Sequence, residues 1–340
     1  MPSNGRVGVG VVGVGQIGRV HAQNLSKNVP NARLVAISDS NLEVARSVAS
    51  QTGISKVYGD YNELVSNSEV EAVIVSVPTV VKLQVVRAAA EAGKHVFCEK
   101  PMSLTLEEAD QFISISEKAA IKLQVGYQRR FDPSYIRVKQ AIDAGEVGKM
   151  LILRSNTRDP PQKVAGWADP KVSGGIFLDT SSHDYDVIRW LSGSEVTRVM
   201  ADGGTEAYPE LGVLGDLDTT MSILHLSNGA LAHVDACRVS VYGYDIRAEV
   251  VGTEGAIFMS IGKSSNTQIL KKGHEGNQYS YWYMERFGEA YRMELEEFAG
   301  AVASDTPVRV NARDGKAAVE IGLAARRSVT GGVAVRLPLS

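Results

Sequence analysis

The fold of this chain is decided near its start, where Val7-Gly8-Val9-Gly10-Val11-Val12 is followed at once by Gly13-Val14-Gly15-Gln16-Ile17-Gly18. The first six residues are valine or glycine and carry no charge, which predicts a strand covered on both faces. The next six match the pattern G-x-G-x-x-G, and a helix-like segment with an apolar stripe runs from about residue 16 to residue 27. A glycine turn between a buried strand and a helix is typical of a dinucleotide-binding βαβ unit.

The three glycines of this motif have separate tasks. Gly13 permits the tight turn, Gly15 lets the backbone approach a pyrophosphate, and Gly18 allows close packing of helix on strand. Asp39 ends the second predicted strand, 33–38, and lies 21 residues beyond Gly18. A carboxylate there accepts hydrogen bonds from a ribose 2′-OH and repels a 2′-phosphate, so we predict NAD as the cofactor rather than NADP. The alternative is that the glycines only form a tight turn.

Strands and helices alternate as far as residue 126, which predicts βαβ units and a mostly parallel sheet. The further predicted strands are 72–77, 95–98 and 121–126, and the helices are 42–51, 80–92 and 106–119. After Tyr127 the pattern changes, because Asn228-Gly229 predicts a type I′ hairpin between strands 219–226 and 230–239.

Two more predicted strands, 246–251 and 256–260, flank a second turn, and helices are predicted at 177–191, 284–303 and 312–329. The fold class is therefore α/β. We expect an NAD-binding Rossmann domain over residues 1–127, and an α+β substrate-binding and oligomerisation domain with an antiparallel sheet over 128–340.

Composition excludes several classes of protein. The chain has 340 residues and a formal net charge of -3, which gives no basic footprint for nucleic acid or for an anionic membrane. Its apolar runs are too short to span a bilayer, and Met1–Gly5 has no basic region followed by an apolar core. With only two cysteines, no disulfide framework is expected and the predicted compartment is the cytoplasm.

Two further groups of residues indicate chemistry. Glu99-Lys100-Pro101 follows a predicted strand at its carboxyl end, the edge where open α/β sheets bind ligands. Asp179 and His183 are four residues apart on a predicted helix and so share a face with apolar neighbours. The alternatives are a solvated turn lysine and a satisfied His–Asp pair in the core. No third ligand has convincing spacing, so no metal is predicted.

At this point the sequence resembles the glucose–fructose oxidoreductase / inositol dehydrogenase (Gfo/Idh/MocA) superfamily over nearly its whole length. The glycine motif, Glu99-Lys100-Pro101 and the Asp179/His183 helix carry the resemblance. It is closest to the inositol 2-dehydrogenase branch in the stretches Gly126–Pro133, Gly174–Trp190 and Tyr283–Ala290, the last around Met284-Glu285-Arg286-Phe287. The implied fold is a Rossmann domain followed by a domain with an open-faced antiparallel sheet, which members often use to form tetramers.

The resemblance also implies roles for individual residues. Lys100, Asp179 and His183 would form the catalytic triad, and the same three residues would bind substrate together with Arg129 and either Tyr242 or Tyr244, of which we take Tyr242. The predicted cofactor-binding residues are Gly13, Gly15, Gln16, Ile17, Gly18, Asp39, Ser76, Pro78, Glu99 and Lys100. One position departs from the pattern: many relatives carry His where this chain has Lys82, which we expect to be peripheral.

The expected reaction is NAD-dependent oxidation of a cyclic polyol, of the type myo-inositol to 2-keto-inositol. An unperturbed imidazole titrates near about pH 6.5, which suits His183 as the general base. Asp179 would fix its tautomer, and Lys100 would stabilise the developing alkoxide. The alternatives are a dehydrogenase of another sugar or of scyllo- or chiro-inositol, a hydrolase with tightly bound NAD, and a non-catalytic NAD-sensing protein.

Overall fold

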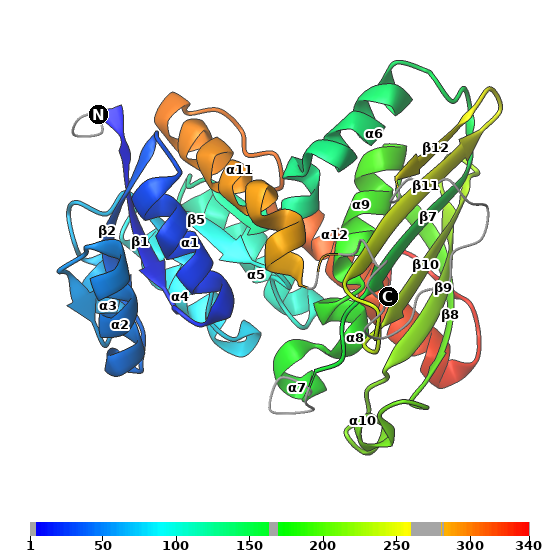
Figure 1. Ribbon diagram of the computed structural model, residues 1–340, viewed down its shortest axis with the longest axis horizontal. Coiled ribbons are helices and arrows are strands. Elements are labelled where there is room, and N and C mark those ends of the chain that lie inside the picture. The colour runs from blue at the N-terminus through cyan, green and yellow to red at the C-terminus, as the bar shows by residue number, and fades with distance from the viewer. Residues whose placement is uncertain (1–4, 163–168, 260–279, 281, 340) are drawn as a thin grey trace. The chain divides into compact units, whose positions relative to one another are not determined.

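The computed structural model describes residues 5–162, 169–259, 280 and 282–339, and it divides into two compact units (Figure 1). The first unit is Met1–Phe131 with Glu289–Lys316, and the second is Asp132–Gly288 with Ala317–Ser340. Each unit is built around one sheet. Each also takes in a segment from the C-terminal part of the chain.

The sheet of the first unit has six parallel strands in the order β3-β2-β1-β4-β5-β6. The strands are β1 (Val7–Val12), β2 (Ala32–Ser38), β3 (Val57–Tyr58), β4 (Ala72–Val75), β5 (His95–Glu99) and β6 (Leu123–Gly126). All six residues of β1 are buried, as its uncharged valine and glycine sequence predicts. This strand order is that of a doubly wound dinucleotide-binding fold, so the predicted fold class is confirmed.

Helices connect these strands and pack on the sheet (Figure 1). They are α1 (Gln16–Lys27), α2 (Leu42–Thr52), α3 (Tyr61–Val65), α4 (Thr79–Glu91), α5 (Leu106–Lys118) and the 3₁₀ helix η2 (Gln128–Phe131). The later part of α11 (Tyr283–Ser304) joins the same unit, because Leu295, Phe298 and Ala299 belong to the core formed by β1, β2 and α1. Helix α11 departs from helical backbone angles at Phe287, next to the point where the two units divide.

The second unit has a seven-stranded sheet in the order β12-β11-β7-β10-β9-β8-β13. The strands are β7 (Met150–Arg158), β8 (Val196–Gly204), β9 (Thr219–Leu226), β10 (Leu231–Cys237), β11 (Asp245–Gly252), β12 (Ala256–Met259) and β13 (Val335–Arg336). The hairpin of β9 and β10 turns at Asn228-Gly229, but the predicted type I′ turn is wrong, because that turn needs a positive φ at both residues and only Gly229, at +88°, has one. The Gly229 N–H donates to the Leu226 carbonyl at 3.0 Å, so the turn is formed by the residues before Gly229. The sheet is mixed and mostly antiparallel, because β10 pairs with β7 in parallel.

The second unit also contains helices, some of which pack on this sheet. They are α6 (Pro133–Asp143), α7 (Pro170–Ser173), α8 (Gly175–Asp179), α9 (Ser182–Ser192), α10 (Pro209–Val213) and most of α12 (Ala312–Gly331). Helix α9 packs on β7 and β10, whose inward residues Leu153, Val234 and Ala236 are buried. The opposite face, called here the open sheet face, has exposed side chains among the described residues: burial alternates residue by residue along β9, and Met221 and Ile223 on it are exposed.

The predicted boundary at residue 127 divides the chain once, whereas the compact units are each formed from two segments. The reason is the apolar face of α11, which a sequence reading places in the second domain but which packs in the first unit's core.

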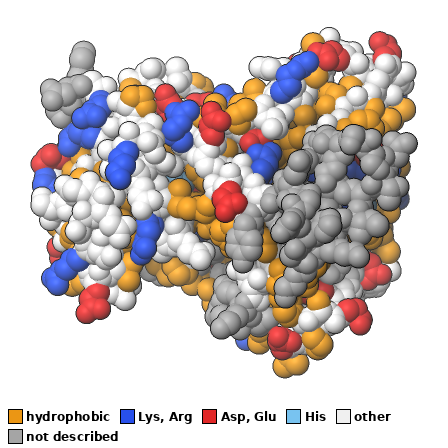
Figure 2. Space-filling model, in the orientation of Figure 1, with side chains coloured by type: hydrophobic (Ala, Val, Ile, Leu, Met, Phe, Trp, Pro, Cys, Tyr) orange, Lys and Arg blue, Asp and Glu red, His pale blue; other side chains and the backbone are white. Residues whose placement is uncertain are grey.

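In the described ranges no helix has the length and apolar character that crossing a bilayer requires. On the face that Figure 2 shows, lysine and arginine side chains are interspersed with acidic ones.

Candidate active site

The glycine turn of the first unit has the geometry that its sequence predicts. Gly13 has a φ of +83°, a backbone conformation that favours glycine. A Cβ on Gly18 would lie 2.0 Å from the carbonyl oxygen of Gly13, so only glycine allows α1 to begin this close to the turn. A Cβ on Gly15 would meet nothing within 4 Å, and Gly15 is exposed. The middle of the turn is therefore open to a ligand while its two ends are tightly packed.

Asp39 and Ser76 lie beside this turn. One Asp39 carboxylate oxygen accepts the Val14 N–H at 2.9 Å, and the other accepts the Asn41 N–H at 2.9 Å. Ser76 Oγ donates to the Gly13 carbonyl at 2.7 Å. Pro78 is exposed and precedes α4, while Gln16 and Ile17 form the first turn of α1. These predicted cofactor residues thus gather at the carboxyl ends of β1, β2 and β4, where the free amides of α1 favour a phosphate.

Glu99-Lys100-Pro101 lies at the carboxyl end of the next strand, β5, and the Lys100–Pro101 bond is cis. The Glu99 carboxylate is held at both oxygens, by His21 Nε2 at 2.7 Å and by the Lys100 N–H at 3.1 Å. Burial raises the pKa of Glu99, but the His21 hydrogen bond and the charges of His21, Lys82 and Lys100 outweigh it and lower the pKa overall. Glu99 is therefore a buried anion directly before Lys100.

Lys82, expected to be peripheral, lies against this turn instead. The residue is 2% exposed, and its Nζ donates to the carbonyl oxygens of Glu99, Lys100 and Pro101 at 2.6, 3.1 and 2.8 Å. The spacing of Lys82 relative to its apolar neighbours could have indicated that it is buried. Lys82, Val85, Val86 and Ala89 follow the i, i+3, i+4, i+7 pattern of one helix face, and all four are buried.

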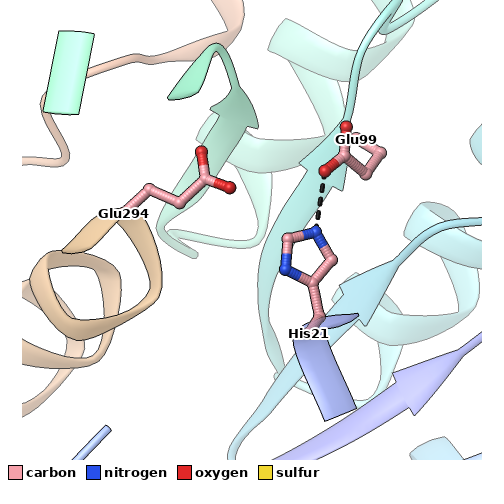
Figure 3. A group of neighbouring side chains, drawn as sticks. All are labelled: His21, Glu99 and Glu294. Carbon is pink, nitrogen blue, oxygen red and sulfur yellow. Dashed lines mark hydrogen bonds and ion pairs between the residues drawn. The ribbon is translucent and has the colours of Figure 1, made fainter. Parts of the chain in front are cut away.

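Glu294 completes a buried group with His21 and Glu99 (Figure 3). Its carboxylate points toward the His21–Glu99 pair, and neither oxygen has a hydrogen-bond partner within the part of the chain that the structure describes. Burial, together with the charge of Glu99, raises the pKa of Glu294 well above its usual value.

Each of these three side chains offers an atom that could bind a metal ion, and the three atoms lie within 4.8 Å of one another. Their chemistry fits proton sharing better than a metal. The nitrogen and oxygen of the His21–Glu99 pair already form a hydrogen bond at 2.7 Å. A raised pKa also favours the neutral form of Glu294, whereas a metal ligand must be ionised.

Arg129 lies in η2, after β6, and its side chain is fully buried. Its neighbours hold η2 within the first unit: Gln128 Nε2 donates to Tyr291 Oη at 3.2 Å, and Arg130 pairs with Asp314 at 3.1 Å. A fully buried guanidinium is costly without polar partners, so the groups around Arg129 fix the position of its side chain.

In the second unit, Asp179 and His183 are on two helices rather than one. Helix α8 ends at Asp179 and α9 begins at Ser182, so the predicted continuous helix over 177–191 is wrong. The amides of Thr180 and Ser181 both donate to the Ile176 carbonyl, at 3.1 and 2.9 Å. The Thr180 bond is the ordinary i→i−4 bond of an α-helix, whereas the Ser181 bond is i→i−5, and the α-helical pattern stops there.

Arg238 supports this helix junction. Its guanidinium donates to Asp216 at 2.7 Å and lies 4.0 Å from the Asp179 carboxylate. Asp216 in turn accepts the Ile176 N–H at 2.9 Å. The side chain of Asp179 is 36% exposed, whereas His183 is 8% exposed. The sequence reading missed Arg238 and Asp216, since neither belongs to a recognisable motif.

Tyr242 and Tyr244 differ in their surroundings. The Tyr242 hydroxyl donates to Asp245 at 2.9 Å and accepts from Arg158 at 3.3 Å, at the start of β11. Tyr244 is buried and packs on Phe287 at a ring distance of 6.2 Å. The predicted catalytic residues are therefore divided between the units, with Lys100 in the first and Asp179 and His183 in the second.

A six-stranded doubly wound sheet with this glycine turn and an acidic residue at the end of β2, followed by a separate α+β unit, defines a dinucleotide-dependent oxidoreductase. Residues 7–127 match the family model described as "Oxidoreductase family, NAD-binding Rossmann fold", and residues 135–258 match the "GFO/IDH/MocA C-terminal domain". The chain belongs to the GFO/IDH/MocA family of NAD-dependent oxidoreductases, as its resemblance indicated.

Relatives match along nearly the whole chain. Myo-inositol 2-dehydrogenase of Thermotoga maritima is 40% identical, over 94% of this chain and 96% of its own length. The scyllo-inositol 2-dehydrogenase (NAD(+)) of Bacillus subtilis is 38% identical, over 96% and 95%. The crystal structure of scyllo-inositol dehydrogenase from Lactobacillus casei with bound NAD(H) and scyllo-inositol has a TM-score of 0.88 at 31% identity, covering 97% of this chain and 99% of that one.

Proposed function

We propose that this protein oxidises a cyclic polyol with NAD, in a reaction of the type myo-inositol to 2-keto-inositol. The observation that carries the proposal is similarity over 94% of the chain to a relative named myo-inositol 2-dehydrogenase. The open glycine turn and the carboxylate of Asp39 fit NAD, which supplies a hydride acceptor when it is bound.

The three proposed catalytic residues act on different parts of this reaction. His183 takes the proton of the hydroxyl group as general base, because an alkyl alcohol is a poor acid. Asp179 fixes the tautomer of His183 and stabilises the imidazolium. Lys100 hydrogen-bonds the reacting oxygen and stabilises its developing negative charge.

Arg129 and Tyr242 are proposed to bind the other hydroxyl groups of the substrate. The hydroxyl of Tyr242 is oriented by Arg158 and Asp245, which supports a fixed position for it. Asp39 and Gly15 are proposed to hold the ribose and the pyrophosphate. Ser76, Pro78 and Glu99 are proposed to complete the cofactor site at the neighbouring strand ends.

The test is a substrate screen with purified protein, measuring formation of NADH by its absorbance. Myo-, scyllo- and chiro-inositol, glucose and xylose are each supplied with NAD or NADP. We expect the highest kcat/KM with myo-inositol and NAD. Absence of turnover on every polyol and sugar would contradict the proposal and would leave the NAD-sensing alternative.

The second candidate is a dehydrogenase specific for scyllo-inositol. It is favoured by the Bacillus subtilis relative at 38% identity and by the Lactobacillus casei structure, both named for that isomer. The two inositols differ in the orientation of one hydroxyl, so the ratio of their kcat/KM values decides between the candidates. Release of NADH with a free polyol separates both from a hydrolase that retains its NAD.

We also propose that the open sheet face joins copies of this chain, as a tetramer, in the cytoplasm. Residues paired across the strands form a row on this face: Phe258, Glu249, Arg154, His233, Ile223 and Met200. Of these, Phe258 is 66% exposed and Ile223 is 50% exposed. Exposed apolar side chains in a row with charged ones are typical of an association surface.

Light scattering after size exclusion tests the assembly. Ile223→Asp places a charge on the open sheet face and should lower the molar mass to that of a smaller species. The control is Arg87→Asp, on the exposed side of α4 in the first unit, which should keep the wild-type mass. An unchanged molar mass for Ile223→Asp would mean that the open sheet face is not the interface.

A further inference from the structure

Lys82 is a buried cation that the proposed reaction does not use. It lies in the first turn of α4, with its side chain running to the turn after β5. A buried ammonium group is costly unless hydrogen bonds replace its water. The carbonyl oxygens of Glu99, Lys100 and Pro101 supply these bonds, and their number matches the three N–H donors of an ammonium group.

The same turn is held on its other side by Glu99. Its carboxylate accepts the Lys100 N–H at 3.1 Å and is itself fixed by His21 at 2.7 Å. The lowered pKa of Glu99 keeps this group charged, so it offsets the charge of Lys82 within the buried region. The main-chain N–H and the main-chain carbonyl of Lys100 are therefore both bound by buried charged groups.

We propose that Lys82 is a positioning residue for Lys100. By holding three successive carbonyl groups it fixes the backbone from which the Lys100 side chain extends, and so sets where the Lys100 ammonium lies. Displacing a catalytic group by about 1 Å can cost about 100-fold in rate. The inference rests on the proposed role of Lys100 in the reaction.

The test is a double-mutant cycle between Lys82→Met and Lys100→Met, read as kcat. Lys82→Met keeps the length of the side chain and removes its donors. We expect it to lower kcat at least about 10-fold in the wild-type background and less than about 3-fold in the Lys100→Met background. A residue that only stabilises the fold would lower kcat by the same factor in both backgrounds.

Two measurements keep this test independent of folding. The Kd for NAD and the thermal midpoint are recorded for every variant. Lys82→Gln, which retains two donors, is the second variant if Lys82→Met does not fold, and a loss smaller than that of the methionine variant is expected. Arg87→Met is the matched control, a cation on the exposed side of the same helix that should leave kcat unchanged.

Equal losses in the two backgrounds, or no loss on changing Lys82, would overturn the positioning role. Failure of the proposed function is distinguishable, because the wild-type protein would then show no turnover in the substrate screen. Full turnover by Lys100→Met alone would remove Lys100 from the reaction, and the positioning role would fall with it.

Discussion

The turn that carries Lys100 and the helix junction that carries Asp179 and His183 are held by different means. Around Lys100, the buried groups of Lys82 and Glu99 bind the main chain directly, at distances between 2.6 and 3.1 Å. At the helix junction, the Arg238 guanidinium lies 4.0 Å from the Asp179 carboxylate. One site is fixed through its backbone, and the other leaves a carboxylate one-third exposed.

This difference suggests a division of tasks. A backbone held by buried charges keeps one arrangement before any ligand binds, which suits the electrostatic role proposed for Lys100. A carboxylate that keeps contact with solvent can adjust as the charge of a neighbouring imidazole changes, which suits proton transfer. Changes at Asp179 or His183 should therefore alter the chemical step with little effect on cofactor binding, whereas changes at the glycine turn or Asp39 should alter cofactor binding.

The largest expected effect is on the chemical step, from His183→Ala. Because the variant lacks the proposed base, kcat should fall at least about 100-fold. The Kd for NAD should stay near that of the wild type, since the glycine turn and Asp39 lie in the other unit. Steady-state turnover and fluorescence titration with NAD measure the two quantities on the same preparation.

Turnover near the wild-type rate in His183→Ala would remove His183 from the role of base. A large loss of NAD affinity would instead break the division of tasks between the units. His183→Gln, which keeps a polar side chain without a basic nitrogen, should behave as the alanine variant does.

A smaller effect is expected in the first unit, from Asp39→Ala. The change removes the proposed acceptor of the ribose hydroxyl and also the acceptor of the Val14 N–H. Hydrogen bonds to a charged group contribute about 1.5–3 kcal/mol, so kcat/KM for NAD should fall about 10- to 100-fold. The preference for NAD over NADP should fall with it, as measured by kcat/KM for both cofactors.

The matched control is Asp60→Asn in the same unit. Asp60 caps α3 by accepting the Asn62 N–H at 2.9 Å, and asparagine caps equally well. This variant should keep both cofactor constants. If Asp39→Ala kept its preference for NAD, discrimination would have to come from another residue.

The two sites also differ in how far the sequence predicts them. The glycine turn was predictable because the strand, the glycines and the helix are each recognisable from residues next to one another in the sequence. The positive φ of Gly13 and the close approach of Gly18 to Gly13 agree with that prediction. The helix break at Thr180 and Ser181 was not, because its cause is an amide bonded to Ile176 and the support of Arg238 and Asp216, distant in sequence. The apolar spacing of α4 did contain Lys82, but a lone lysine among valines does not say which carbonyls it will bind.

The smallest expected effect concerns Glu294, a buried acid of the first unit that sharpens the same comparison. Its pKa is raised by burial and by Glu99, so the folded protein releases this proton at a higher pH than the unfolded chain, in which a glutamic acid titrates at about pH 4.3. The stability from this proton is complete below the unfolded pKa and is lost as the pH rises through the folded pKa. Glu294→Gln removes this dependence.

Urea unfolding over a series of pH values measures the difference between Glu294→Gln and the wild type. Between the unfolded and folded pKa of Glu294, the wild type should lose about 1.4 kcal/mol per pH unit relative to the variant. Glu289→Gln, exposed on the same helix, should give a difference that does not change with pH. A flat difference for Glu294→Gln as well would mean that Glu294 is ionised in the folded protein. In that case the first unit would hold two ionised buried carboxylates, Glu99 and Glu294, close together beside His21.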